Sequence, residues 1–150
     1  MPEGEARVVL AFDFGLRRIG VASGDTVSNT AAPRGAIVVS DRGVDWAAID
    51  RMLHEYQPQL LVVGSPQHAD GTASGLSARA EQFAQALAAR TQLPVHRTNE
   101  YASSIEAAAE LTSQRASGQR RRRVQHADID SAAAAIILER WLRGEGRIDD

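Results

Sequence analysis

The sequence predicts an α/β domain with a mixed sheet, and three observations support this class. Residues 8–39 contain three successive apolar segments of β type, with no helical pattern between them. Two later apolar segments, 60–64 and 95–98, alternate with stretches of helical periodicity. Consecutive strands form hairpins, whereas strands that alternate with helices are typical of a parallel sheet covered by helices. At 150 residues, the chain is long enough for one such domain with a substantial core.

The first strand is expected within residues 8–15, a run rich in β-branched and aromatic residues that ends at a glycine. Side-chain alternation places Asp13 on the same face as Val9 and Ala11, opposite Phe12. A buried carboxylate costs free energy unless hydrogen bonds, a cation or a metal attend it. Asp13 therefore either accepts hydrogen bonds from the following turn or reaches a metal or phosphate at the end of the strand.

The next elements follow in order along the chain. Residues 18–23 are expected to form a hairpin with the first strand, and 33–39 a third strand that begins at a proline. Residues 46–56 place apolar side chains at helical spacing, and Pro58 ends that helix. The wholly apolar run 60–64 indicates a strand covered on both faces.

The second half of the chain predicts three more helices and one more strand. These are a helix over 74–90, a strand over 95–98, a helix from Ser103 to about Ser113 that begins with capping-box spacing, and a final helix from near Asp128 to before Gly144. We expect one domain over residues 1–150, with 115–127 as a mobile basic loop and 145–150 as a tail. Gly20 and Gly24 are interpreted as residues that permit tight turns.

Composition excludes several classes of site. The chain contains no cysteine, which excludes disulfides, thiolate metal sites and a cysteine nucleophile and is typical of a cytoplasmic protein. We find no apolar run long enough to span a membrane and no signal-peptide pattern. The net charge is only −2, but all 17 cationic side chains are arginines and five of them lie between Arg115 and Arg123. Arginine offers a planar, forked set of donors that suits phosphate.

Acidic residues follow the ends of the predicted strands and open the last helix. We expect Asp13 on the first strand and Glu100 just beyond the last strand to approach one edge of the sheet, and Asp128 and Asp130 lie at the start of the final helix. If these carboxylates converge, a hard cation such as Mg²⁺ or Mn²⁺ must neutralise them, and a pair of such ions could activate water for phosphodiester hydrolysis. Each acid also has a structural interpretation: Asp128 as a helix cap, Asp130 as a partner of the helix dipole and Glu100 as a solvated side chain.

Several motifs together resemble the YqgF/RuvX family of Holliday-junction-resolvase-like nucleases, which are linked to maturation of the 5′ end of 16S ribosomal RNA. The motifs are DFGLRRIGVA at 13–22, GSP at 64–66 with DG at 70–71, NE at 99–100 and IDSAAAAIILE at 129–139. The resemblance covers nearly the whole chain in order. It implies a ribonuclease-H-like fold with a mixed five-stranded sheet of order 3-2-1-4-5, the second strand antiparallel, flanked by helices.

The resemblance also implies the site residues. The family's metal-binding and catalytic acids match Asp13, Glu100 and Asp130, with Mg²⁺ or Mn²⁺ as the cofactor. The usual D-E-R of the family reads N-E-Y here, so Asn99 and Tyr101 replace a charge and an arginine that would lie near the substrate. The usual G-L-P reads G-S-P, and Asp128 matches no family residue.

The expected function is therefore a divalent-metal-dependent endonuclease that hydrolyses phosphodiester bonds of structured nucleic acid. The favoured substrate is pre-16S rRNA, alone or on ribosomal particles, and the protein is expected to be a monomer or weak dimer. The alternatives are a Holliday-junction-type DNA resolvase and a non-catalytic nucleic-acid-binding factor in transcription or ribosome assembly. The candidate phosphate-binding side chains are Arg17, Arg18, Arg120, Arg121, Arg122 and Arg123.

Overall fold

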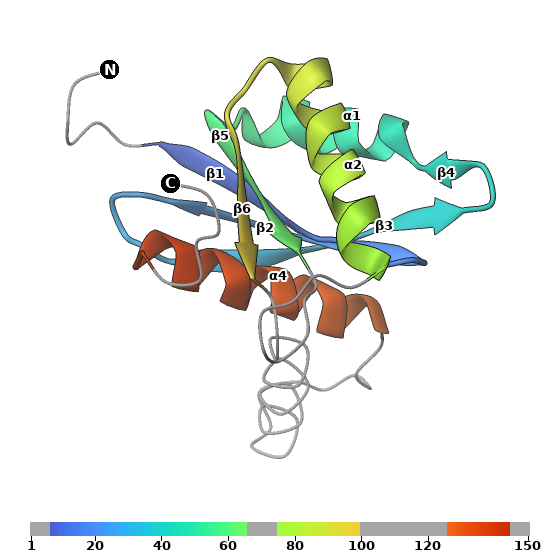
Figure 1. Ribbon diagram of the computed structural model, residues 1–150. Helices are drawn as coiled ribbons and strands as arrows, with labels where there is room; N and C mark the ends of the chain where they lie inside the picture. Colours follow the sequence, from blue (N-terminus) through green and yellow to red (C-terminus); the bar gives the residue numbers. More distant parts are fainter. Residues whose placement is uncertain (1–6, 66–74, 100–125, 145–150) are drawn as a thin grey trace.

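The computed structural model describes residues 7–65, 75–99 and 126–144 (Figure 1). Within these ranges a six-stranded sheet has the order β4-β3-β2-β1-β5-β6. Its strands are β1 (Val8–Asp13), β2 (Arg18–Asp25), β3 (Ala31–Ser40), β4 (Gly43–Val44), β5 (Leu60–Ser65) and β6 (Val95–Asn99). The described helices are α1 (Trp46–Tyr56), α2 (Gly75–Thr91) and α4 (His126–Leu142). Each predicted strand and helix in these ranges is thus confirmed, with small shifts at the ends.

The strand pairing confirms the expected mixed sheet. Strands β1, β5 and β6 are parallel to one another, whereas β2 is antiparallel to both β1 and β3. The sixth strand was not predicted: β4 adds only Gly43 and Val44 to the end of β3. Two residues carry too little alternation to be recognised in a sequence.

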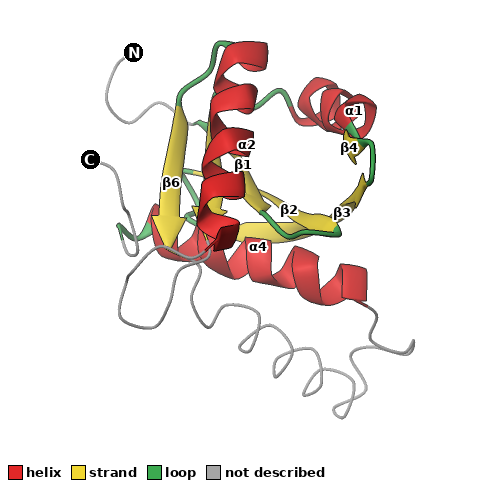
Figure 2. Cartoon of the chain, turned by 45° about the vertical axis from the view of Figure 1, so that its right-hand side comes forward, coloured by secondary structure: helices red, strands yellow, loops and turns green. Residues whose placement is uncertain are grey.

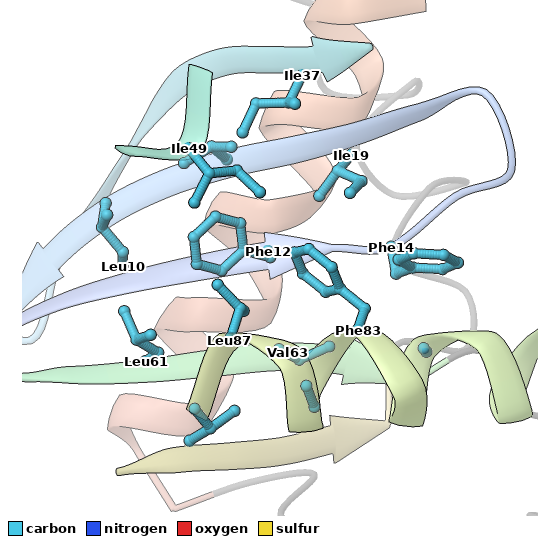
Figure 3. Packing of buried hydrophobic residues seen from close by; sticks show 14 residues of the cluster. Leu10, Phe12, Phe14, Ile19, Ile37, Ile49, Leu61, Val63, Phe83 and Leu87 are labelled. Carbon is cyan, nitrogen blue, oxygen red and sulfur yellow. The ribbon is translucent and has the colours of Figure 1, made fainter. Parts of the chain in front are cut away.

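The sheet separates two layers of helices. Figures 1 and 2 show α1 and α2 on one face and α4 on the other. Leu10 and Phe12 belong to the larger apolar cluster beneath α1 and α2 (Figure 3), whereas Val9 and Ala11 pack with side chains of α4. The predicted alternation along β1 is therefore confirmed, and it places Asp13, the next residue of that series, on the α4 face.

Strand β5 also contributes to both layers. Leu61 and Val63 lie in the cluster with α1 and α2, and Leu60 and Val62 lie in the cluster with α4. The prediction of a strand covered on both faces is confirmed. No helix in the described part of the chain is long and apolar enough to cross a membrane.

Helix α1 begins and ends where its sequence signals predict. The Asp45 side chain accepts a hydrogen bond from the Ala48 backbone N–H at 3.2 Å and caps the first turn. At the other end, Gln57 adopts a left-handed conformation with φ of 49°, one residue before the predicted stop at Pro58. The Trp46 ring stacks on Phe83 of α2 at a centroid distance of 5.6 Å, which joins the two helices of this layer.

An ion pair joins α2 to the edge strand β6, and it makes stability depend on pH. Arg97 donates from Nε and Nη2 to the two carboxylate oxygens of Glu81 at 3.0 and 2.8 Å. The hydrogen bond from Arg97 lowers the pKa of Glu81 below its ordinary value of 4.5. The ion pair therefore stabilises the fold fully above the pKa that Glu81 has in the unfolded chain. This stabilisation is lost as the pH falls through the lower pKa that Glu81 has in the folded protein.

Glu81→Gln is expected to lower the free energy of unfolding by about 0.5 kcal/mol at pH 7, because the pair is partly exposed to solvent. The difference from the wild type should shrink at pH 3, where the Glu81 carboxylate is increasingly protonated. Urea unfolding at the two pH values measures this, with Glu55→Gln at an exposed position of α1 as control. A loss that is equal at both pH values would contradict the assignment.

Candidate active site

Asp13 is the last residue of β1, which lies between β2 and β5 in the sheet. Its backbone is level with Gly20 of β2 on one side and Gly64 of β5 on the other, and Gly64 is in turn level with Thr98 of β6. The side chain is only 7% exposed. A carboxylate at this depth is costly to keep charged unless polar or cationic groups accompany it.

Helix α4 lies against β2 because that strand carries small residues on the α4 face. A Cβ added at Gly20 would lie 1.9 Å from the carbonyl oxygen of Asp130, closer than any real contact allows. Ala22, the next residue on this face, packs against Ala134 and Ala135. The backbone of Asp130 is therefore in direct contact with the strand position that is paired with Asp13.

The interpretation of Gly20 and Gly24 as turn residues is wrong. Both lie inside β2, and both are close to another part of the backbone. An added Cβ at Gly24 would lie 2.5 Å from the Thr30 oxygen and 3.0 Å from Cδ2 of Leu138. Absence of a side chain, rather than freedom of φ, is what these positions require, because the helix and a neighbouring segment occupy the space.

The hydroxyl of Ser131 fastens the first part of α4 to the sheet. Ser131 is 3% exposed, and its Oγ donates to the Val21 carbonyl at 3.1 Å and accepts from the Gly35 N–H at 2.8 Å. These groups lie where the pairing of β2 and β3 shifts register, between Gly20 and Ala22. The bulge leaves backbone groups without a strand partner, and the serine satisfies two of them. The adjacent Asp130 is thereby held at a defined place over β2.

The side chain of Asp130 is paired with an arginine of the same strand. Arg18 donates from Nε to Oδ2 of Asp130 at 2.6 Å, and the two side chains are 35% and 26% exposed. Arg18 was expected to contact nucleic acid, and in the structure it is paired with Asp130, a candidate metal ligand. Arg17, the other arginine of this hairpin, has an exposed side chain, and its carbonyl accepts from the Val39 N–H at 2.8 Å.

Several predicted site residues lie outside the described part of the chain. Glu100 directly follows Asn99, the last residue of β6. Asn99 pairs with Ser65, one residue beyond the Gly64 position that is level with Asp13. Residues 120–123, the expected helix from Ser103 and most of the expected basic loop 115–127 are also outside. Residues 126 and 127 of that loop belong to α4, so Asp128 lies within the first turn of the helix rather than before it.

The described acids have the chemistry of a hard-cation site. Asp13 and Asp130 flank Gly20 on the α4 face, and both offer carboxylate oxygens. Among residues 7–65, 75–99 and 126–144, no group of three or more histidine, aspartate or glutamate side chains could hold a metal ion. Mg²⁺ commonly takes one or two protein carboxylates and completes its shell with water and phosphate oxygens. The donor set therefore fits a magnesium or manganese ion.

The sequence proposed Asp13 and Asp130 as site residues, but the contacts that position Asp130 were not predicted. Ser131 was not singled out, although it is the polar residue at the start of an otherwise apolar run from Ala132 to Leu138. A buried polar residue on the apolar face of a helix needs a partner, so this pattern was a usable signal. The Arg18 contact carries no such signal, because its partner is 112 positions away.

Solved structures show which class of protein has this fold. The chain is similar to T. thermophilus RuvC in complex with a Holliday junction substrate, with a TM-score of 0.51, 15% identity and coverage of 95% of this chain and 99% of that one. It is also similar to the Fowlpox virus resolvase in complex with substrate Holliday junction DNA, with a TM-score of 0.53, 14% identity and coverage of 91% and 97%. The protein has the ribonuclease-H-like fold of the RuvC-type resolvases.

Sequence comparison identifies the family within that fold. The family model RuvX, described as Holliday junction resolvase, matches residues 7–144. A relative named "Putative pre-16S rRNA nuclease" from Xanthomonas campestris pv. campestris (strain B100) is 44% identical over an alignment of 146 residues, with coverage of 95% of this chain and 94% of the relative. A relative of the same name from Hydrogenovibrio crunogenus (strain DSM 25203 / XCL-2) is 40% identical over 135 residues, covering 90% and 92%. The chain belongs to the RuvX family, as its motifs predict.

Proposed function

We propose that this protein is a Mg²⁺- or Mn²⁺-dependent endonuclease that hydrolyses structured nucleic acid, with the 5′ end of pre-16S rRNA as its substrate. The observation that carries the proposal is that the backbone positions of two acids far apart in the sequence meet at one residue: Asp13 is paired with Gly20, and Gly20 touches the backbone of Asp130. Membership of a nuclease family and the names of its relatives support the choice of reaction and substrate. We expect the protein to act in the cytoplasm as a monomer or weak dimer.

The proposed roles follow from the donor chemistry. Asp13, Asp130 and Glu100 would hold the divalent cation. The cation would offset the negative charge that develops on the phosphate oxygens and lower the pKa of an attacking water. The attacking water gives up a proton as its oxygen adds to phosphorus, the bond from phosphorus to the leaving oxygen breaks, and that oxygen takes up a proton. The chain has no cysteine nucleophile, which is consistent with direct attack by water.

Arginine side chains around the acids would hold the substrate. A polyanion is repelled by carboxylates unless cationic groups compensate, and phosphate contacts dominate affinity for nucleic acid. We propose Arg17, Arg18 and the run from Arg120 to Arg123 for this role. The exposed side chain of Arg17 lies in the connection that follows Asp13 directly, which supports its assignment.

Cleavage of an RNA fragment that spans the mature 5′ end of 16S rRNA tests the proposal. We expect cleavage with Mg²⁺ or Mn²⁺, none with EDTA, and recovery when Mg²⁺ is added in excess of the chelator. The reason is that water activation and charge neutralisation both depend on the cation. Binding of the fragment without cleavage under every metal condition would instead favour a non-catalytic factor in transcription or ribosome assembly.

A Holliday-junction DNA resolvase is the second candidate, because the fold and the family description both point to it. Symmetric cleavage of a four-way junction requires two active sites related by a two-fold axis. The same assay with a four-way DNA junction, together with the oligomeric state in solution, separates the two substrates. Paired incisions by a dimer would favour the junction, whereas cleavage of the RNA fragment by a monomer would favour rRNA.

A further inference from the structure

The ion pair between Arg18 and Asp130 lies inside the candidate active site rather than on an unrelated surface. Arg18 and Gly20 are two residues apart on β2, so their side-chain positions are on the same face, the α4 face. Asp13 is directly opposite Gly20, which makes Arg18 the diagonal neighbour of Asp13 as well as the hydrogen-bond partner of Asp130. Arg18 is thus hydrogen-bonded to Asp130 and occupies a strand position diagonal to that of Asp13.

The geometry of this pair differs from that of the other ion pairs between described residues. Arg90 and Arg97 each reach both oxygens of their partners with two nitrogens, at 2.8 to 3.0 Å. Arg18 uses one nitrogen on one oxygen, at 2.6 Å. The contact therefore leaves Oδ1 of Asp130 and the two terminal nitrogens of Arg18 outside any hydrogen bond within the described part of the chain.

We infer that Arg18 is an internal counter-ion of the acidic site, which balances Asp130 in the metal-free protein and competes with a divalent cation for it. The inference rests on the proposed function. Clustered carboxylates repel one another, and some cation must offset that repulsion when no metal ion is present. A partly exposed pair with a single hydrogen bond contributes little free energy, so it can be exchanged for stronger metal–oxygen contacts. Once released, the guanidinium still has the donors for a phosphate.

Mn²⁺ binding to the protein without nucleic acid tests this inference. Wild type, Arg18→Gln and Arg18→Lys are titrated with Mn²⁺, and free Mn²⁺ is measured by electron paramagnetic resonance. Removing a unit charge a few ångströms from a divalent ion is expected to tighten Mn²⁺ binding about tenfold in Arg18→Gln. Arg18→Lys, which keeps the charge, should stay within about threefold of wild type. Arg51→Gln, at an exposed position of α1 on the other face of the sheet, is the control and should leave the affinity unchanged.

Thermal unfolding gives a second measurement of the same competition. In EDTA, Arg18→Gln is expected to melt below the wild type, because Asp130 has lost its partner. Saturating Mn²⁺ should reduce that difference, since the ion then binds the variant more tightly. A difference in melting temperature that Mn²⁺ leaves unchanged or enlarges would overturn the inference.

The possible outcomes separate this inference from the proposed function. Unchanged Mn²⁺ affinity in Arg18→Gln would overturn it, and weaker affinity would show that Arg18 orients Asp130 as a positioning residue instead. Asp130→Asn tests the metal site itself and should lose Mn²⁺ binding. If wild type, Arg18→Gln and Asp130→Asn all fail to bind Mn²⁺, the proposed metal site and the inference both fail. If wild type binds Mn²⁺ and only the Arg18→Gln result is contrary, the proposed function stands.

Discussion

Asp13→Asn is expected to lower kcat/KM for metal-dependent cleavage by about a thousandfold, which corresponds to about 4 kcal/mol of transition-state stabilisation. The amide keeps the size of the carboxylate but removes the negative charge and one anionic ligand oxygen. Asp13 is 7% exposed. At the end of β1, its backbone lies between Gly20 of β2 and Gly64 of β5. No other described acid lies on the central strand, so we expect no substitute ligand from β1.

The measurement is single-turnover cleavage with saturating Mg²⁺, accompanied by urea unfolding of the same variant. We expect the free energy of unfolding to change by no more than about 1 kcal/mol, because the lost interactions of a buried charge are offset by the lost cost of burying it. Asp41→Asn, at an exposed turn position between β3 and β4, is the matched control and should be fully active. Asp13→Asn with more than a tenth of wild-type activity would remove Asp13 from the site.

Gly20→Ala is expected to destabilise the fold by about 3 kcal/mol, the upper part of the usual range for overpacking. The added methyl group would lie 1.9 Å from the Asp130 carbonyl oxygen, 2.3 Å from its carbon and 3.0 Å from the Ser131 nitrogen. All three are backbone atoms, so no side-chain rotation relieves the clash and α4 itself must move. Chemical denaturation measures the loss.

The displacement of α4 should also impair the site. We expect Gly20→Ala to lose cleavage activity even at temperatures where it is fully folded, since Asp130 is carried away from Asp13. Gly24→Ala is the matched control, because it clashes with Thr30 and Leu138 farther along β2 and leaves the start of α4 alone. It should lose stability but retain activity while folded. Equal activity losses in the two variants would show that the position of Asp130 over Gly20 is not what the site requires.

Much of the fold could be predicted because it depends on local patterns of apolar and polar residues along the chain. The alternation of Val9, Ala11 and Asp13 against Leu10 and Phe12 indicated which residues share a face, and the structure confirms this on both sides of the sheet. The strand β4 escaped prediction because two residues have no periodicity. The start of α4 was placed two residues late, since Asp128 was interpreted as a cap although the helix already includes His126.

The sequence proposed the acids of the candidate site, whereas the contacts of those acids could not be predicted. Asp13 and Asp130 were identified from charge in unexpected places and from family motifs. The role of Gly20 was misinterpreted because the sequence does not distinguish a glycine that makes room for another backbone from a glycine that permits a turn. The contact between Arg18 and Asp130 was not predicted, because no local rule pairs two residues 112 positions apart.

The sequence by itself determined the order of strands and helices and the face on which Asp13 lies. Each of these follows from spacing between neighbours in the chain. Only the tertiary structure decided that the start of α4 rests on Gly20, that Ser131 fills the bulge of β2 and that Arg18 holds Asp130. The physical reason is that these contacts exist only after the helix packs on the sheet, and the depth and register of that packing depend on all the side chains between them.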